Sequence, residues 1–277
     1  MAAVKVVDSI TKLDASDAGQ VLIAASHGGV YPAYLAAKAH LRGVILHDAG
    51  LGLDRAGIAS LDYLDRLGMA AATIGHLSAR IGDGADMAAR GRVSHVNRAA
   101  AALGCVAGEN CRDCAEKMLQ AAPCAADPPS YEEARFLLRH EAGEPEVWGI
   151  DSNALVRAED AGMIVVTGSH GGLLGGRPES AIRVAVRAAV YHDAGIGIDR
   201  AGISRLPALE GRGIIAATVA GETARIGEAR SVWQSGRLST LNPAAERVGA
   251  RLGMAVPDFV AAVIAAGKSR RAAASGV

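Results

Sequence analysis

The sequence predicts an α/β protein made of two similar halves, and two observations support that prediction. First, the twelve residues 47–58 return as 192–203 with ten identical positions, and the other two are Leu-to-Ile changes. Second, each half alternates short apolar runs with helical patterns, which is typical of parallel strands joined by crossover helices. We therefore expect a tandem duplication of an αβα subdomain with a parallel sheet, in which a pseudo-twofold axis relates the two copies.

The repetition extends to both sides of that block. Before it, segments recur 143 residues later, and beyond it they recur 145 residues later, because two extra residues enter the second half. Such a period is far longer than the roughly 20–50 residues of a solenoid repeat. We expect a first repeat over 1–122, a linker with a bridging helix over 123–147, a second repeat over 148–267 and a flexible basic tail over 268–277.

Apolar periodicity places the individual elements. Strands are expected over 4–7, 21–25, 44–47 and 70–74, and again over 148–150, 163–167, 189–192 and 214–219. Helices are expected over 32–39, 58–67, 93–103 and 111–121, and again over 181–187, 203–209, 238–248 and 257–266. In the linker, Ser130 and Glu133 have the spacing of a capping box, which predicts a helix over 131–142.

Composition excludes several kinds of partner. Lys plus Arg equals Asp plus Glu at 29 each, so no overall charge attracts nucleic acid or a membrane surface. Aromatic residues make up only 3%, which leaves few faces for base or sugar stacking. No apolar run approaches the roughly 18 residues of a membrane span, and the N-terminus lacks a signal-peptide layout. We expect a cytoplasmic homo-oligomer that acts on a small molecule and binds neither nucleic acid nor a membrane.

The segment Ser-His-Gly-Gly follows a predicted strand in both halves. In a parallel sheet the ligand crevice lies beyond the carboxyl ends of the strands, and paired glycines let the backbone approach a ligand. A strand-to-helix turn capped by serine is the alternative interpretation. The full Gly-x-Ser-x-Gly pattern of a nucleophile elbow is absent, although an exposed serine is expected. The candidates are Ser26, His27, Gly28 and Gly29 with Ser169, His170, Gly171 and Gly172.

The segment His-Asp-Ala-Gly ends another predicted strand in both halves. Neighbouring histidine and aspartate can act as a general base and its orienting group, and the candidates are His47, Asp48, His192 and Asp193. Two histidines and one aspartate in each half could also hold Zn²⁺ or Fe²⁺. Their separation in the sequence forms no compact ligand motif, so we assign no metal and no cofactor. A divalent metal held by His and Asp is the alternative.

Further residues are candidates for substrate binding. The glycine-dense loop 171–178 ends in Arg177 and suits a carboxylate or phosphate. The repeated arginines are ligand contacts or ion-pair partners. The remaining candidates are Arg55, Arg200, Thr73, Thr218 and Glu222.

These observations favour an enzyme, most simply a hydrolase, that acts on a small carboxylate- or amide-bearing metabolite in a cleft between the repeats. Ser169 or Ser26 would be the nucleophile or oxyanion donor, and His170 or His192 the base. A lyase or isomerase that uses the His-Asp pairs is one alternative. An anion-binding sensor protein without catalysis is the other.

Cys111 and Cys114 have the spacing of a zinc or redox pair. The second half, however, has Val256 and Phe259 at the matching positions. Positions three apart share a helical face, and a buried free cysteine behaves as a small hydrophobe. We interpret both cysteines as part of the core.

The double substitution Cys111→Val with Cys114→Phe is therefore expected to leave function intact. Overpacking can cost about 1–3 kcal/mol, so the free energy of unfolding has to be measured beside activity. Complete loss of activity in a protein that still folds would contradict the core interpretation.

Overall fold

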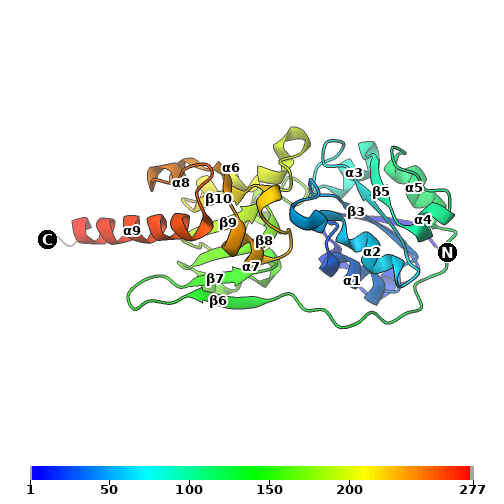
Figure 1. Cartoon of the computed structure of the whole chain (residues 1–277), viewed down its shortest axis with the longest axis horizontal. Helices are drawn as coiled ribbons and strands as arrows, with labels where there is room; N and C mark the ends of the chain where they lie inside the picture. The colour runs from blue at the N-terminus through cyan, green and yellow to red at the C-terminus, as the bar shows by residue number, and fades with distance from the viewer. Residues whose placement is uncertain (1, 275–277) are drawn as a thin grey trace.

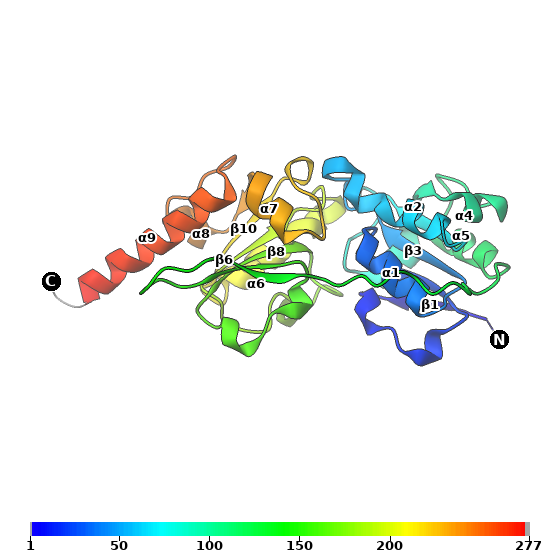
Figure 2. The same ribbon diagram turned by 60° about the horizontal axis from the view of Figure 1, so that its bottom comes forward.

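Residues 2–274 are described by a computed structural model, which shows an α/β protein with two mixed sheets. The halves that carry these sheets lie side by side along the long axis, and the linker crosses from one to the other along their edge (Figures 1 and 2). Among the described residues, no helix is both long and apolar enough to cross a membrane.

The first sheet has five strands in the order β1-β2-β3-β4-β5. Its four parallel strands are β1 (Val4–Val7), β2 (Val21–His27), β3 (Gly43–His47) and β4 (Ala70–Ile74), and β5 (Val93–Val96) is antiparallel. Alternate β2 residues enter two separate cores, as a strand covered on both faces requires. One core includes α1 (Val30–Lys38) and α2 (Ala59–Asp65), and the other includes α3 (Gly84–Arg90), α4 (Arg98–Ala102) and α5 (Cys111–Met118).

The second sheet has six strands in the order β11-β10-β9-β8-β7-β6. Its parallel strands are β7 (Val147–Ile150), β8 (Ile164–His170), β9 (Ala188–His192) and β10 (Ile215–Val219). Antiparallel strands β11 (Leu238–Leu241) and β6 (Arg135–Arg139) form the two edges. One core includes α6 (Arg205–Glu210), and the other includes residues of α7 (Ala229–Ser235), α8 (Pro243–Arg247) and α9 (Val256–Ala274).

The sheets are therefore mixed, and the prediction of wholly parallel sheets was wrong. Two predicted helices were also wrong, because part of each segment forms an antiparallel strand. Residues 93–103 and 238–248 each form an edge strand followed by a short helix. The Asn97 and Asn242 side chains mark the change, because each accepts a hydrogen bond from a backbone N–H in the first turn of the following helix.

Two further helix predictions were wrong. Residues 135–139 form β6 instead of a linker helix, because pairing with β7 places Phe136 against Gly149 and Arg135 over the Trp148 ring. Residues 181–187 form no helix, because the Ala181 carbonyl accepts hydrogen bonds from side chains instead of from a helical N–H. At the C-terminus, α9 continues to Ala274, so helical backbone covers 268–274, while 275–277 lie outside the described residues.

The two halves meet at a seam formed by the loops beyond the carboxyl ends of the parallel strands. The loops approach so closely that a methyl group at Gly50 would lie 2.7 Å from Gly195 Cα. Arg80 pairs with Asp199 at 2.9 Å, and Arg225 pairs with Asp54 at 3.1 Å. The seam also has a small apolar core of Ala49, Ala56, Ile81, Ala194, Ala201 and Ile226. These contacts bring the strand-end residues of both halves together.

Candidate functional site

The predicted serines lie within β2 and β8, and neither is an exposed group. Ser26 is buried, and its hydroxyl accepts a hydrogen bond from the Ile10 N–H at 3.1 Å. The Ser169 hydroxyl accepts one from the Asn153 N–H at 2.8 Å. Each serine therefore holds the turn that follows the neighbouring strand. Within residues 2–274, neither hydroxyl is hydrogen-bonded to a histidine, and Gly29 rather than a serine occupies the N-cap of α1.

His47 and His192 have both ring nitrogens engaged with the backbone. In His47, Nδ1 accepts from the Ala49 N–H at 3.1 Å, and Nε2 lies 3.0 Å from the Ala79 carbonyl oxygen. The corresponding distances at His192 are 3.0 Å and 3.0 Å. This pattern assigns a neutral ring with its proton on Nε2. Because both nitrogens are engaged, neither histidine has a free nitrogen to act as a base, and burial also lowers the pKa of both rings.

The adjacent aspartates organise the turns. Asp48 Oδ1 accepts from the Gly50 and His76 N–H groups at 3.1 and 2.9 Å, and Asp193 Oδ1 accepts from the Gly195 and Gly221 N–H groups at 2.9 and 3.0 Å. Asp48 Oδ1 also contacts the His76 ring at 3.1 Å, and this hydrogen bond raises the pKa of His76. The second half has glycine at that position. These carboxylates are therefore acceptors for backbone amides on both sides of the seam.

His27 and His170 are bound on one nitrogen only. Nδ1 of His27 accepts from the Gly29 N–H at 3.2 Å, and Nδ1 of His170 accepts from the Gly172 N–H at 3.1 Å. The proton of each neutral ring is thus on Nε2, for which no hydrogen-bond partner exists among the described residues. Burial lowers the pKa of His27 to about 4, and His192 and His47 add to this effect. Burial, followed by Arg205, also lowers the pKa of His170.

A small cavity lies beside His27, between the first half, the linker and the second half. It offers about 20 Å³ to the centres of water-sized molecules, and one water needs roughly 10–15 Å³. Burial raises the pKa of Glu133 in its wall to about 7, and Asp151 adds to this effect. The lining residues are His27, Gly29, Val30, Tyr31, Ala56, Ala59, Tyr131, Glu133, Arg225, Ile226, Gly227 and Glu228.

The sequence had not identified Glu133, Tyr131, Arg225 or Glu228 as site residues. Arg225 belongs to the segment that repeats at 79–82 and 224–227, which was a usable signal. Glu133 was interpreted as a helix-capping residue. No sequence pattern distinguishes it from Glu132, because its altered pKa arises from burial in the tertiary structure.

The matching position in the second half is filled by protein. The two-residue insertion lies in the loop after His170, and Gly175 of this loop donates its N–H to the Gly82 carbonyl at 2.7 Å. A methyl group at Gly82 would lie 2.2 Å from the Leu173 carbonyl oxygen, whereas one at Gly227 would contact only His27 within 4 Å. Arg177, a predicted anion contact, pairs with Asp8 at 3.2 Å. The seam therefore has a cavity on the His27 side and a loop on the His170 side.

Other predicted residues lie away from the cavity. Thr73 and Thr218 are buried and hydrogen-bonded to serine hydroxyls at 3.0 Å. Methyl groups at Gly28 and Gly171 would collide with the carbonyl oxygens of opposite turns, so these glycines allow close packing. Glu222 is exposed. Arg55 and Arg200 line grooves on the outer surface of the protein.

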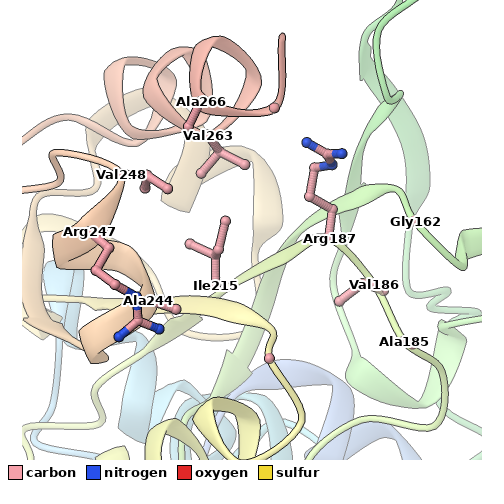
Figure 3. Close-up of a pocket in the computed structure, with 12 residues that line it drawn as sticks. Gly162, Ala185, Val186, Arg187, Ile215, Ala244, Arg247, Val248, Val263 and Ala266 are labelled. Atoms are coloured by element: carbon pink, nitrogen blue, oxygen red, sulfur yellow. The ribbon is translucent and has the colours of Figure 1, made fainter. Parts of the chain in front are cut away.

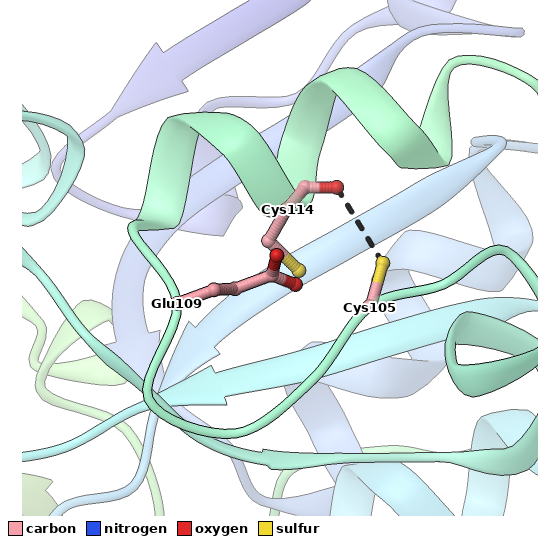
Figure 4. Close-up of side chains that lie close together, drawn as sticks. All are labelled: Cys105, Glu109 and Cys114. Atoms are coloured by element: carbon pink, nitrogen blue, oxygen red, sulfur yellow. Dashed lines mark hydrogen bonds between the residues drawn. The ribbon is translucent and has the colours of Figure 1, made fainter.

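The predicted metal-ligand sets do not converge. Among the described residues, the three possible metal ligands whose atoms all lie within 4.8 Å of one another are Cys105, Glu109 and Cys114 (Figure 4). They belong to neither predicted set. The Glu109 carboxylate already binds the Lys117 ammonium and the Val106 N–H, while the Cys105 thiol donates to the Cys114 carbonyl at 3.6 Å. This network is satisfied internally.

The cysteine pair Cys111 and Cys114 faces the first core from α5. Burial raises the pKa of the Cys111 thiol to about 12, and the hydrogen bond with Cys105, followed by burial, raises the pKa of Cys114. A raised pKa disfavours the thiolate that metal binding and redox exchange need. The described geometry agrees with the core interpretation.

A groove of about 580 Å³ lies at the end of the second sheet that faces away from the seam. Arg187 and Arg247 lie on either side of it (Figure 3). Arg42 occupies the matching position in the first half, where it donates to the carbonyl oxygens of Gly19 and Ala121. Arg187 lies instead against Gly267. The groove thus reflects a different position of one arginine side chain.

Comparison with protein-family models, with curated proteins and with solved structures finds no match to this chain.

The substitution His27→Gln is expected to reduce the loss of stability in acid. The usual histidine pKa is 6.5 and that of folded His27 is about 4, so between these values the unfolded chain binds more protons, and stability decreases as the pH is lowered. Allowing for partial exposure of the ring, the contribution of His27 between pH 7 and pH 4 is on the order of 2 kcal/mol.

The measurement is the difference in unfolding free energy between the two proteins across that pH range. Glu133 and His76, whose pKa values are raised, act with the opposite sign but are present in both proteins. Parallel pH curves for the two proteins would contradict the account.

Proposed function

We propose that this protein is an enzyme that hydrolyses a small amide- or carboxylate-bearing molecule in the cavity beside His27. The single observation that carries the proposal is that two groups with oppositely shifted pKa values line the same cavity. His27 stays neutral well below pH 7, while Glu133 titrates near pH 7. Titratable groups whose pKa values are displaced in opposite directions within one cavity are typical of acid–base catalysis.

The hydrogen bonds of His27 define its role in this proposal. Its Nδ1 is held by the Gly29 N–H, so the ring presents Nε2–H as a donor and not as a base. A neutral donor of this kind polarises a carbonyl and stabilises the negative charge that develops on its oxygen. His27 would therefore be the oxyanion donor, a role first assigned to the neighbouring serine.

Glu133 would be the general base. Its carboxylate takes a proton from water as the water oxygen bonds to the amide carbon, and the carbonyl oxygen gains charge beside His27 Nε2–H. The C–N bond then breaks, and Glu133 returns the proton to the leaving nitrogen. The cavity has room for about one water, so a substrate requires the linker segment with Tyr131 and Glu133 to move outward.

The filled side of the seam supports an amide substrate. At Gly82, the peptide groups of Leu173 and Gly175 occupy the space that matches the cavity at Gly227. A peptide-like group therefore fits this backbone environment.

The same two groups favour a second reaction class. A carboxylate base beside a neutral imidazole donor is also suited to removing a proton next to a carbonyl, as an isomerase or lyase requires. Exchange of a substrate C–H for deuterium in D₂O would identify that reaction. An increase in melting temperature without turnover would support an anion-binding sensor.

We also propose that the halves are a tandem duplication related by a pseudo-twofold axis near Gly50 and Gly195. Equivalent hydrogen bonds at Ser26 and Ser169, and at His47 and His192, support this relation. The reciprocal ion pairs across the seam support it as well. A cytoplasmic setting is proposed too, since four buried cysteines are free.

The substitution Glu133→Gln is expected to lower kcat/KM by about 10² or more, as for removal of a general base. In the unchanged protein, kcat/KM should rise with pH through an apparent pKa of about 7, because Glu133 has to be ionised. The pH profile would be measured with the best substrate from a panel of small amides, lactams and hydroxy acids.

Glu132→Gln is the matched control, since it removes a neighbouring exposed carboxylate. It should leave both the rate and the profile unchanged. An unaltered pH profile in Glu133→Gln would exclude Glu133 as the base.

A further inference from the structure

Two grooves on the outer surface are lined by the same positions of the two halves. One includes Arg55 and has a volume of about 630 Å³, and the other includes Arg200 and has about 650 Å³. Each of the eleven residues around the first lies 145 positions before its partner in the second. Volumes of roughly 300–1,000 Å³ are typical of small-molecule sites. The grooves are therefore a feature of the repeated turn and not of one surface loop.

The turn that begins each groove is strained in the same way. Asp54 and Arg55 have φ values of 53° and 57°, and Asp199 and Arg200 have 54° and 56°. Residues other than glycine rarely adopt this left-handed region, and such strain clusters at ligand-binding sites. The ion pairs across the seam account for the left-handed conformation of the two aspartates, since each pairs with an arginine of the other half. They do not account for the left-handed conformation of Arg55 and Arg200.

Arg55 and Arg200 have no hydrogen bond or ion pair from their guanidinium groups within residues 2–274, and both side chains are exposed. In the second groove the other charged groups are already paired. Asp199 binds Arg80 and Arg90, and Glu210 binds Arg247. Arg200 is left as an uncompensated cation at one end of that groove. In the first groove, exposed Asp62 offsets the charge of Arg55, whereas Pro207 is its counterpart.

The rest of the second groove is mainly apolar. Ile203 and Leu206 are buried in its wall, Leu241, Pro207 and Pro243 add apolar surface, and Ser204 and Thr240 contribute hydroxyl groups. The polar atoms of Asn242 are used internally, since its side chain accepts from Ala216 and Ala245 and donates to Ile214. A ligand in this groove thus meets one free cation on a mainly aliphatic surface.

We propose that the groove at Arg200 is a binding site for a small organic anion, namely a carboxylate or phosphate carried on a short aliphatic body. Arg200 binds the anionic group through its planar guanidinium, and the aliphatic body packs on Ile203, Leu206 and Leu241. The groove at Arg55 binds the same class more weakly because of Asp62. This site is separate from the His27 cavity and does not depend on the proposed hydrolysis.

The test is titration calorimetry of the whole chain with hexanoate, hexyl phosphate and hexanol. At least one of the two anions should bind saturably, and the tighter one identifies the anionic group. Arg200→Gly should weaken that binding about tenfold or more, as loss of a bidentate charge contact implies. Glycine suits the positive φ, so this variant should fold at least as well as the original protein. Hexanol should bind more weakly than the anions and respond little to the substitution.

Arg237→Ala is the matched charge control, because Arg237 is also repeated and exposed but lies outside the groove. The Arg237→Ala protein should bind the anions with the same affinity as the unchanged protein. Asp62→Asn should strengthen binding at the first groove and raise the number of anions bound per chain. The proposal is overturned if neither anion binds saturably, or if Arg200→Gly and Arg237→Ala have the same affinity.

Discussion

The seam depends on one repeated interaction, a hydrogen bond from a backbone N–H to the Nδ1 atom of a strand-end histidine. His27, His47, His170 and His192 each accept this bond from the residue two positions ahead, at 3.0–3.2 Å. The bond bends the chain at the strand end and places the proton on Nε2. A ring fixed in this way stays neutral when buried, so four histidines can lie close together without mutual repulsion. Substituting aspartate or lysine there would bury an uncompensated charge.

The function proposed for the seam follows from one difference between two halves that share many contacts. His47 and His192 use their second nitrogen on a backbone carbonyl, whereas His27 and His170 do not. On the His170 side, the inserted loop fills the adjoining space. On the His27 side, the linker supplies Glu133 and leaves a cavity. A repeated architecture with one filled position is consistent with a single site.

The sequence predicted the parallel strands well, because strands covered on both faces are continuous apolar runs bounded by turns. Residues 70–74 are an example. It did not predict the antiparallel edge strands. Residues 93–96 and 135–139 include polar side chains and are mostly half-buried, so they lack the continuous buried apolar run of a central strand.

For the site, the sequence predicted where the residues lie but not what they do. The repeated Ser-His and His-Asp segments located the seam, because identical polar residues in two copies needed a reason. Their roles could not be predicted from the pattern, since hydrogen bonding to backbone amides accounts for Ser26 and Asp48 without any substrate. Glu133 was missed because its raised pKa depends on its burial where the linker packs against the two halves.

The most direct test of this account is the protonation state of the strand-end histidines. Long-range ¹H–¹⁵N correlation NMR of the imidazole rings distinguishes the two neutral forms from the charged one. The account predicts that His27 is neutral at pH 6 and that the neutral rings of His27, His47, His170 and His192 carry their proton on Nε2. A charged His27 ring at that pH, or a proton on its Nδ1, would contradict both the assigned hydrogen bonds and the proposed role of His27.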